Sequence, residues 1–324
     1  MAEIKYLDLA GLTTYDRMLK EWFNAGVVDI ADEAINALFA TGDGYTLIAL
    51  KKVDISNISY EEVDLGLKSG RKWANKNIGA QTIEDYGTYF SWGNTDGYTV
   101  SGTKFLTVDE ACQLFSDVIG ETITTKEELE NILSQDGLTI DNLGIVDGYS
   151  FDEDTYSSTN GAEFTGDVLD STHDAATTIM GDSWRMPTID EYKELVNAVK
   201  TSAEDNENPL TCTYIYLDKQ GNRNEYIVYR ENTTDYFNIS LPEYSAILGI
   251  KFTNYVTDAS VYFPTCGNVD SSILAGIGLV GGYWSSSVND NTTGALDLYF
   301  IPDSVFANGS STQYYGLCVR AVKA

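Results

Sequence analysis

The sequence predicts an α+β fold, and three patterns support this prediction. From about residue 61 onward, short apolar and aromatic runs alternate with turns rich in glycine and asparagine, which is typical of antiparallel strands. Three Thr-x-x-Glu capping boxes indicate a few helices within the same region. An amphipathic stripe near the N-terminus indicates a separate helical segment. We therefore expect a helical segment over 1–45, a linker strand over 46–60 and one domain over 61–324.

The N-terminal segment has the pattern of two short helices. The stripe of the first helix recurs at spacings of three and four, and it consists of Leu12, Tyr15, Leu19 and Trp22. A second helix is expected over 29–39. Helices this short are not stable alone, so they must dock on their own chain, on copies of themselves or on a larger assembly. We expect attachment or oligomerisation. A turn at 41–44 then leads into a strand over 45–50.

Helices and strands of the main domain follow local signals. The capping boxes pair Thr107 with Glu110, Thr125 with Glu128, and Thr188 with Glu191. The first two predict helices over 107–119 and 125–134, and the third predicts a helix directly after Pro187. Two strands, 214–217 and 226–229, flank a polar turn at 218–224 and predict a hairpin. The regions 100–170 and 200–245 are expected to be insertions.

The charge balance excludes one class of partner. The chain has 20 basic and 49 acidic residues, for a net charge of −29. Such a surface repels phosphate backbones and anionic membrane surfaces, so we expect no nucleic acid and no membrane as partners. Two explanations of the charge stay open. It keeps an abundant protein soluble, or it belongs to an acidic particle surface or binds a partner with basic patches.

Cysteine and histidine usage argues against a metal centre and against cofactors. Cys112, Cys212, Cys266 and Cys318 lie far apart, and His173 is the sole histidine, so a Cys/His zinc site is excluded. Two disulfides are conceivable, but free buried thiols are expected.

The N-terminus lacks a secretory signal, and no segment reaches the roughly 18 apolar residues that span a bilayer. We expect a protein that stays in the cytoplasm or is released with virus particles by lysis.

Several sequence blocks resemble the Fibrobacter-type major paralogous domain family, which is widespread in gut Bacteroidetes and their phages. In chain order, the blocks are Val63-Asp64-Leu65-Gly66-Leu67-Lys68-Ser69-Gly70, Lys72-Trp73-Ala74, Asn77-Ile78-Gly79-Ala80, Tyr86-Gly87-Thr88-Tyr89-Phe90, Trp92-Gly93, Asp174-Ala175-Ala176, Trp184-Arg185-Met186-Pro187-Thr188, Tyr262-Phe263-Pro264, Gly282-Tyr283-Trp284-Ser285-Ser286-Ser287, Leu298-Tyr299-Phe300 and Gly316-Leu317-Cys318-Val319-Arg320-Ala321-Val322. They follow one another in the family's order over a stretch of about 260 residues. The N-terminal residues 4–12 resemble the start of Bacteroidetes phage fibre proteins.

This resemblance implies a C-type-lectin-like fold of the formylglycine-generating-enzyme type, related to the variable proteins of diversity-generating retroelements. Trp184 and Trp284 are expected to anchor the core because of their size. Arg185 and Arg320 are expected to be structural clamps that bind carboxylates or backbone carbonyls. The copper-holding cysteine pair of formylglycine-generating enzymes has no counterpart in the spacing of the cysteines here, so that activity is not implied.

No residue set in the sequence assembles a convincing catalytic site. His173 is isolated, and the serine run 285–287 has no histidine that the sequence can place beside it, so its hydroxyls are expected to bond the backbone at a strand end. The acidic run 152–154 lacks the spacing of an EF-hand loop and is expected to be a solvated loop, although calcium binding stays possible. With so many carboxylates, a glycosidase-like pair also stays open.

The C-terminal loops predict a binding surface. They are rich in Asn, Ser, Thr and Tyr, the residues that antibody paratopes use, although any surface loop is polar. We expect Ala295, Leu298 and Phe300 to be framework residues, which requires a bulge or bend between Ala295 and Leu298. The expected ligand-binding residues are Asn289, Asn291, Asp297, Tyr299, Phe306, Asn308, Gln313, Tyr314 and Tyr315.

The sequence as a whole predicts a non-enzymatic virion protein, such as a phage fibre, receptor-binding or capsid decoration protein. Its expected partners are a host surface glycan or protein, other virion proteins bound through the N-terminal segment, and copies of itself, with a trimer favoured. Two alternatives stay open. One is a bacterial cell-surface adhesin, and the other is an enzyme that acts on glycans or peptidoglycan.

Overall fold

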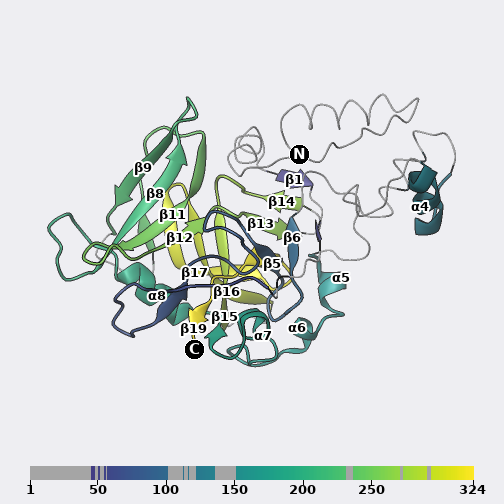
Figure 1. Cartoon of the computed structure of the whole chain (residues 1–324), viewed down its shortest axis with the longest axis horizontal. Helices are drawn as coiled ribbons and strands as arrows, with labels where there is room; N and C mark the ends of the chain where they lie inside the picture. Colours follow the sequence, from purple (N-terminus) through teal and green to yellow (C-terminus); the bar gives the residue numbers. More distant parts are fainter. Residues whose placement is uncertain are drawn as a thin grey trace.

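The computed structural model describes residues 45–47, 50–51, 55, 57–100, 112, 116, 122–135, 151–230, 236–270, 273–289 and 293–324. Short, mostly antiparallel strands dominate these residues, and a few short helices accompany them (Figure 1). The predicted α+β class is confirmed. The stripe Leu12, Tyr15, Leu19 and Trp22 lies outside the described residues.

An eight-stranded sheet runs through the centre of the described residues. Its order is β10 (Tyr236–Asn238), β17 (Ser304–Thr312), β16 (Gly294–Ile301), β15 (Gly281–Val288), β18 (Leu317–Cys318), β5 (Thr88–Phe90), β6 (Tyr98–Val100) and β2 (Leu50–Lys51). All neighbours are antiparallel except β15 and β18.

Three smaller sheets accompany it. One has the order β12 (Ser260–Pro264), β11 (Ala246–Asn254), β8 (Leu210–Leu217) and β9 (Arg223–Val228). Another has the order β3 (Glu62–Asp64), β4 (Lys72–Ala74), β19 (Val322–Lys323) and β7 (Trp184–Arg185). The last joins β1 (Tyr45–Leu47), β14 (Ile273–Ala275) and β13 (Asn268–Asp270). Because Val322 pairs with Trp73, the beginning and the end of the main domain meet in one sheet.

The described helices are short. They are α4 (Lys126–Gln135), α5 (Glu153–Tyr156), α6 (Asn160–Glu163), α7 (Ala175–Met180) and α8 (Ile189–Asn197). The Thr188–Glu191 capping box is formed and starts α8. The Thr125–Glu128 box is also formed, with hydrogen bonds of 3.2 and 3.1 Å, so α4 begins one residue after the predicted start. Of the helix predicted over 107–119, only Cys112 and Ser116 are described, and both are helical.

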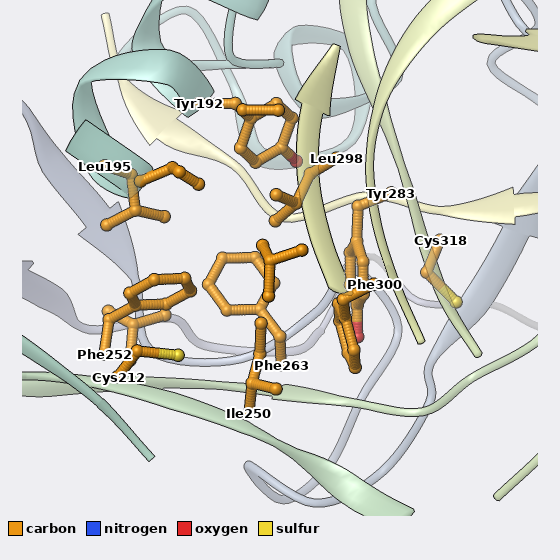
Figure 2. Packing of buried hydrophobic residues seen from close by; sticks show 14 of the residues in the cluster. Tyr192, Leu195, Cys212, Ile250, Phe252, Phe263, Tyr283, Leu298, Phe300 and Cys318 are labelled. Atoms are coloured by element: carbon orange, nitrogen blue, oxygen red, sulfur yellow. The ribbon is translucent and has the colours of Figure 1, made fainter. Parts of the chain in front are cut away.

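Two core clusters lie on opposite faces of the eight-stranded sheet. On β15, Tyr283 belongs to the larger cluster and its chain neighbour Trp284 to the smaller one; on β16, Leu298 belongs to the larger cluster and Ala295, three residues before it, to the smaller one. In Figure 2, Tyr192 and Leu195 of α8 face side chains from β8, β11 and β12 across the larger cluster. Side chains alternate between the faces of a strand, so β15 and β16 are buried on both faces. Trp184 and Trp284 are buried, as predicted.

Both predicted arginine clamps are confirmed. The Arg185 guanidinium binds both carboxylate oxygens of Glu191, and it also donates to the carbonyl of Met186 at 2.9 Å. Arg320 is fully buried and donates to Asn77 Oδ1 at 2.9 Å and to the carbonyls of Ala74 and Tyr262 at 3.1 and 2.6 Å. All four cysteines are free and buried, as predicted.

The 214–229 hairpin is confirmed, because Tyr214 pairs with Tyr226 in β8 and β9. Two other local predictions were wrong. The strand over 45–50 is two strands in different sheets, since β1 pairs with β14 and β2 pairs with β6. The acidic run 152–154 is not a loop: Asp152 caps α5 by accepting from Thr155 N at 2.8 Å.

Candidate ligand-binding surface on the C-terminal hairpin

The predicted surface is built on the hairpin of β16 and β17. Its strands pair from Gly294 with Thr312 to Ile301 with Ser304, and the register shifts between Asp297 and Tyr299. That shift gives β17 one more residue than β16 over this stretch, so the bulge lies in β17. Leu296 packs against the larger core cluster with Leu298 and Phe300, and Ala295 belongs to the other cluster.

The predicted bulge between Ala295 and Leu298 is therefore not needed to place them. Ala295, Leu298 and Phe300 are all fully buried framework residues, as expected. The register shifts at this stretch lie in the neighbouring strands, between Trp284 and Val288 of β15 and in β17 opposite Asp297 and Tyr299, and not in β16 itself. Both faces of β16 are covered, so regular alternation buries residues on either side.

Side-chain to main-chain hydrogen bonds hold β15, the strand beside the hairpin, in place. Trp284 Nε1 donates to the carbonyl of Phe90 at 2.7 Å, and Trp92 Nε1 donates to the carbonyl of Ser285 at 2.9 Å. The serine hydroxyls bond the backbone, as predicted: Ser285 Oγ donates to the carbonyl of Leu296 at 2.6 Å. The serine run lies within β15 and is buried, because both faces of that strand are covered.

Four of the predicted residues meet at the open end of the hairpin. Asn289 N and Gln313 Nε2 both donate to the carbonyl of Gly294, at 3.1 and 3.4 Å. Asn289 Nδ2 also donates to Ser310 Oγ at 2.6 Å. Tyr314 and Tyr315 follow Gln313 directly. We call Asn289, Ser310, Gln313, Tyr314 and Tyr315 the tyrosine surface.

The two tyrosines form an edge-to-face pair on an anchored segment. Their ring centroids lie 5.2 Å apart with an interplanar angle of 80°. The carbonyl of Gln313 accepts from Trp92 N at 2.8 Å, and the carbonyl of Tyr314 accepts from Ser91 Oγ at 3.1 Å. Both rings are half-buried, and partial burial raises the pKa of Tyr315, which also lies near Asp270. Aromatic pairs of this geometry are preferred over face-to-face stacks.

A second group lies further along the hairpin. Tyr299 and Phe306 are opposite each other in the register, and both are half-buried. Asn308 is exposed. Tyr299 is five residues from Gly294, which corresponds to roughly 17 Å along a strand. The predicted residues therefore form two groups on one hairpin rather than one patch. Asn291 lies outside the described residues.

Asp297 is the clearest correction. It was expected to project outward, but its side chain is fully buried. Ser311 Oγ donates to Asp297 Oδ2 at 2.6 Å, whereas Oδ1 has no hydrogen-bond partner. Burial raises the pKa of this carboxyl to about 7. A Cβ at Gly309 would overlap Oδ1, so the carboxyl occupies space that only a glycine leaves free.

Sequence reasoning missed Ser310, Ser311 and Gly309. The Ser-rich run around them was visible as a polar loop, and Gly309 within a strand could have indicated a close approach. Ser91 and Asp270 lie far away in the sequence, so no local pattern connects them to the hairpin.

The histidine and the open pocket in the described part of the chain lie outside the tyrosine surface. His173 Nδ1 is bonded to Asp170 Oδ1 at 2.8 Å, and its ring packs 5.0 Å from that of Phe164. Among the described residues, no three His, Cys, Asp or Glu side chains are grouped so that they could hold a metal ion. An open pocket of about 540 Å³ lies between residues 62–66 and 257–260, and its lining includes no residue of the hairpin.

The comparisons with known proteins identify no relative. No family model, no curated protein and no solved structure matches the chain. In the described residues, none of the helices has the length and apolar character needed to cross a membrane.

Proposed function

We propose that this chain is a non-enzymatic ligand-binding protein of a phage particle, and that the tyrosine surface contacts a host surface glycan or protein. The observation that carries the proposal is the anchored pair of Tyr314 and Tyr315. Tyrosine offers contact area at a low cost in conformational entropy, and aromatic anchors dominate the energy of many interfaces. A pair held by the framework before binding loses little further freedom.

Three further features support this function. Asn289, Ser310 and Gln313, at the same end of the hairpin, add hydrogen-bonding groups to the tyrosine surface. Tyr315 packs against the core cluster that contains the buried side chains of Trp92 and Trp284. From the family resemblance, the proposal takes a C-type-lectin-like fold and a place in the virion. The N-terminal stripe is proposed to attach the chain to other virion proteins or to form a homo-oligomer.

Binding to cells tests the proposal. Fluorescently labelled full-length protein is titrated on intact cells of a panel of gut Bacteroidetes strains and measured by flow cytometry. On a strain that binds, Tyr314→Ala or Tyr315→Ala should cost about 2 kcal/mol, or about 30-fold in affinity, because a hot-spot ring is removed. Tyr255→Ala is the matched control, since Tyr255 is an exposed tyrosine at the turn between β11 and β12.

Two outcomes contradict the proposal. Unchanged binding by both variants, or an equal loss with Tyr255→Ala, would show that the tyrosine surface is not the contact. Release of soluble sugar from the cells over many turnovers would show an enzyme instead. Periodate or protease treatment of the cells then distinguishes a glycan from a protein ligand.

A further inference from the structure

Strand β9 is an outer edge of the molecule. It is the last strand in the order β12-β11-β8-β9, and no strand among the described residues pairs with its other side. Figure 1 shows β9 outermost, with β8 between it and β11. An edge strand presents unpaired N–H and C=O groups to any strand that approaches.

The main-chain groups that face outward can be identified from the hairpin. Asp218 N donates to the carbonyl of Asn222 at 3.0 Å and closes the turn. Hydrogen-bonded and non-hydrogen-bonded pairs alternate along an antiparallel ladder, and this ladder has no register shift. Counting from the Asp218–Asn222 pair, the N–H and C=O groups of Arg223, Glu225 and Ile227 point away from β8.

Exposed apolar surface lies on β9 at Tyr226 and Ile227 and, directly after the strand, at Tyr229. Tyr226, Ile227 and Tyr229 are 38%, 50% and 39% exposed. Natural edges are commonly protected by charged side chains. Here the charges of the strand are already paired within the chain, because Arg223 binds Glu84 at 2.6 Å and Glu225 binds Lys251 at 3.4 Å. The edge is therefore locally neutral on a chain with a net charge of −29.

We propose that β9 pairs with β9 of a second copy of this chain, antiparallel and with the two-fold axis at Tyr226. Of the axes at Asn224, Glu225 and Tyr226, only the last makes the strand self-complementary. An axis at Glu225 would place two carboxylates opposite each other, and an axis at Asn224 would run the pairing into the turn at Gly221. An axis at Tyr226 lets the outward groups of Glu225 bond those of Ile227 in the second copy.

The same register matches the side chains. Tyr226 lies opposite its own copy in a non-hydrogen-bonded pair, where side chains are closest. Arg223 lies opposite Tyr229 of the second copy, a suitable pair for a cation–π contact. Because like charges do not oppose each other in the strand, only the net charge of the two molecules resists association, so added salt should favour the pairing. This interface is separate from the N-terminal stripe.

Cysteine cross-linking tests the register in the full-length chain. In the proposed pairing, the two Tyr226 Cα atoms lie about 4.5 Å apart, within the range of a disulfide. Tyr226→Cys with oxidised glutathione should give a covalent dimer on a non-reducing denaturing gel. The four native cysteines are buried, so the background is low. Tyr229→Cys is the matched control, because its exposure is the same within one per cent but the two positions lie roughly 20 Å apart across the axis.

We expect at least about tenfold more dimer from Tyr226→Cys than from Tyr229→Cys, since a held contact raises the effective thiol concentration to the millimolar range. Equal cross-linking at both positions, or none at Tyr226 in the folded protein, would overturn the proposal. A partner protein on this edge would give the second result.

Two substitutions of opposite charge at Ile227 give a second, independent test of the register. Ile227 faces Glu225 of the second copy, so Ile227→Glu in the Tyr226→Cys chain should reduce the covalent dimer, and Ile227→Lys should retain or increase it. Both variants change an exposed position, so the melting temperature serves as the check that they fold. A dimer yield that is insensitive to the sign of the charge would contradict the register.

Discussion

Ser311 Oγ donates a hydrogen bond of 2.6 Å to Asp297 Oδ2, and both residues lie on the β16–β17 hairpin. Among the described residues, no other group donates a hydrogen bond to this carboxyl. Its second oxygen, Oδ1, has no hydrogen-bond partner and lies close to Gly309. Burying a carboxyl with so few partners disfavours its charged form, which is why its pKa is raised. The hairpin therefore carries a titratable group within the neutral pH range.

We predict that Asp297→Asn flattens the dependence of stability on pH. The folded pKa is about 7 and the ordinary value is 3.8, so below pH 3.8 both states hold the proton and there is no cost. Between pH 4 and 7 the unfolded state loses the proton first, and the free energy of unfolding falls by up to ~4 kcal/mol. Above pH 7 the loss is complete.

Urea unfolding at pH 5, 6, 7 and 8 measures this effect. Subtracting the profile of the variant from that of the wild type cancels all other titrating groups, including the buried Asp174, whose pKa is also raised. Parallel profiles would mean that Asp297 is not the titrating group.

Gly309→Ala should destabilise the protein by ~1–3 kcal/mol, the usual cost of overpacking. Gly309 does not have a left-handed backbone angle, so the need for glycine comes from the close approach of Asp297 Oδ1. The cost should be smaller in an Asp297→Ala background, where the oxygen is gone. A double-mutant cycle in urea measures the coupling, and additive effects would show that the two residues do not compete for space.

Arg320→Lys should destabilise the domain by ~3 kcal/mol or more, because a lysine cannot replace three hydrogen bonds from a buried planar group. Burial lowers the pKa of Arg320 to about 10, so the group stays charged at neutral pH and must be bonded. Arg223→Lys is the control, since its exposed ion pair with Glu84 should contribute ~1 kcal/mol or less. Equal unfolding midpoints for the two variants would contradict the clamp.

The N-terminal stripe can be tested in the full chain. Leu12→Asp combined with Leu19→Asp should reduce an oligomer to a smaller assembly in light scattering, because charges interrupt the apolar stripe. The melting temperature of the main domain should stay the same. Arg17→Asp changes the net charge by the same amount on the opposite helix face and serves as the control. An unchanged mass for the double variant would leave the stripe without a role in self-association.

Local signals predicted the local structure well. The Thr188–Glu191 box and the hairpin of β8 and β9 depend on residues close in the chain, so the sequence carries them directly. The strand over 45–50 failed for the opposite reason: β14 and β6, which divide it, lie far away in the chain.

Part of the candidate surface was also predictable. Asn289, Gln313, Tyr314 and Tyr315 were expected together, and the first two meet at the carbonyl of Gly294. The polar and aromatic composition of these loops was sufficient for that prediction. The burial of Asp297 was not predictable. Alternation along a strand assigns residues to two faces, but it does not say which of the two faces is covered by other elements.

The sequence by itself determined the α+β class, the capped helices, the free thiols and the arginine clamps, because these depend on residue chemistry and short spacings. The tertiary structure alone decided the burial of Asp297 and the exposure of β9. A second core cluster, assembled from Phe90, Trp184, Leu317 and other distant residues, covers the outer face of β15 and β16, whereas no described strand pairs with the outer edge of β9. Which face of a strand is covered depends on long-range packing, and no local pattern encodes it.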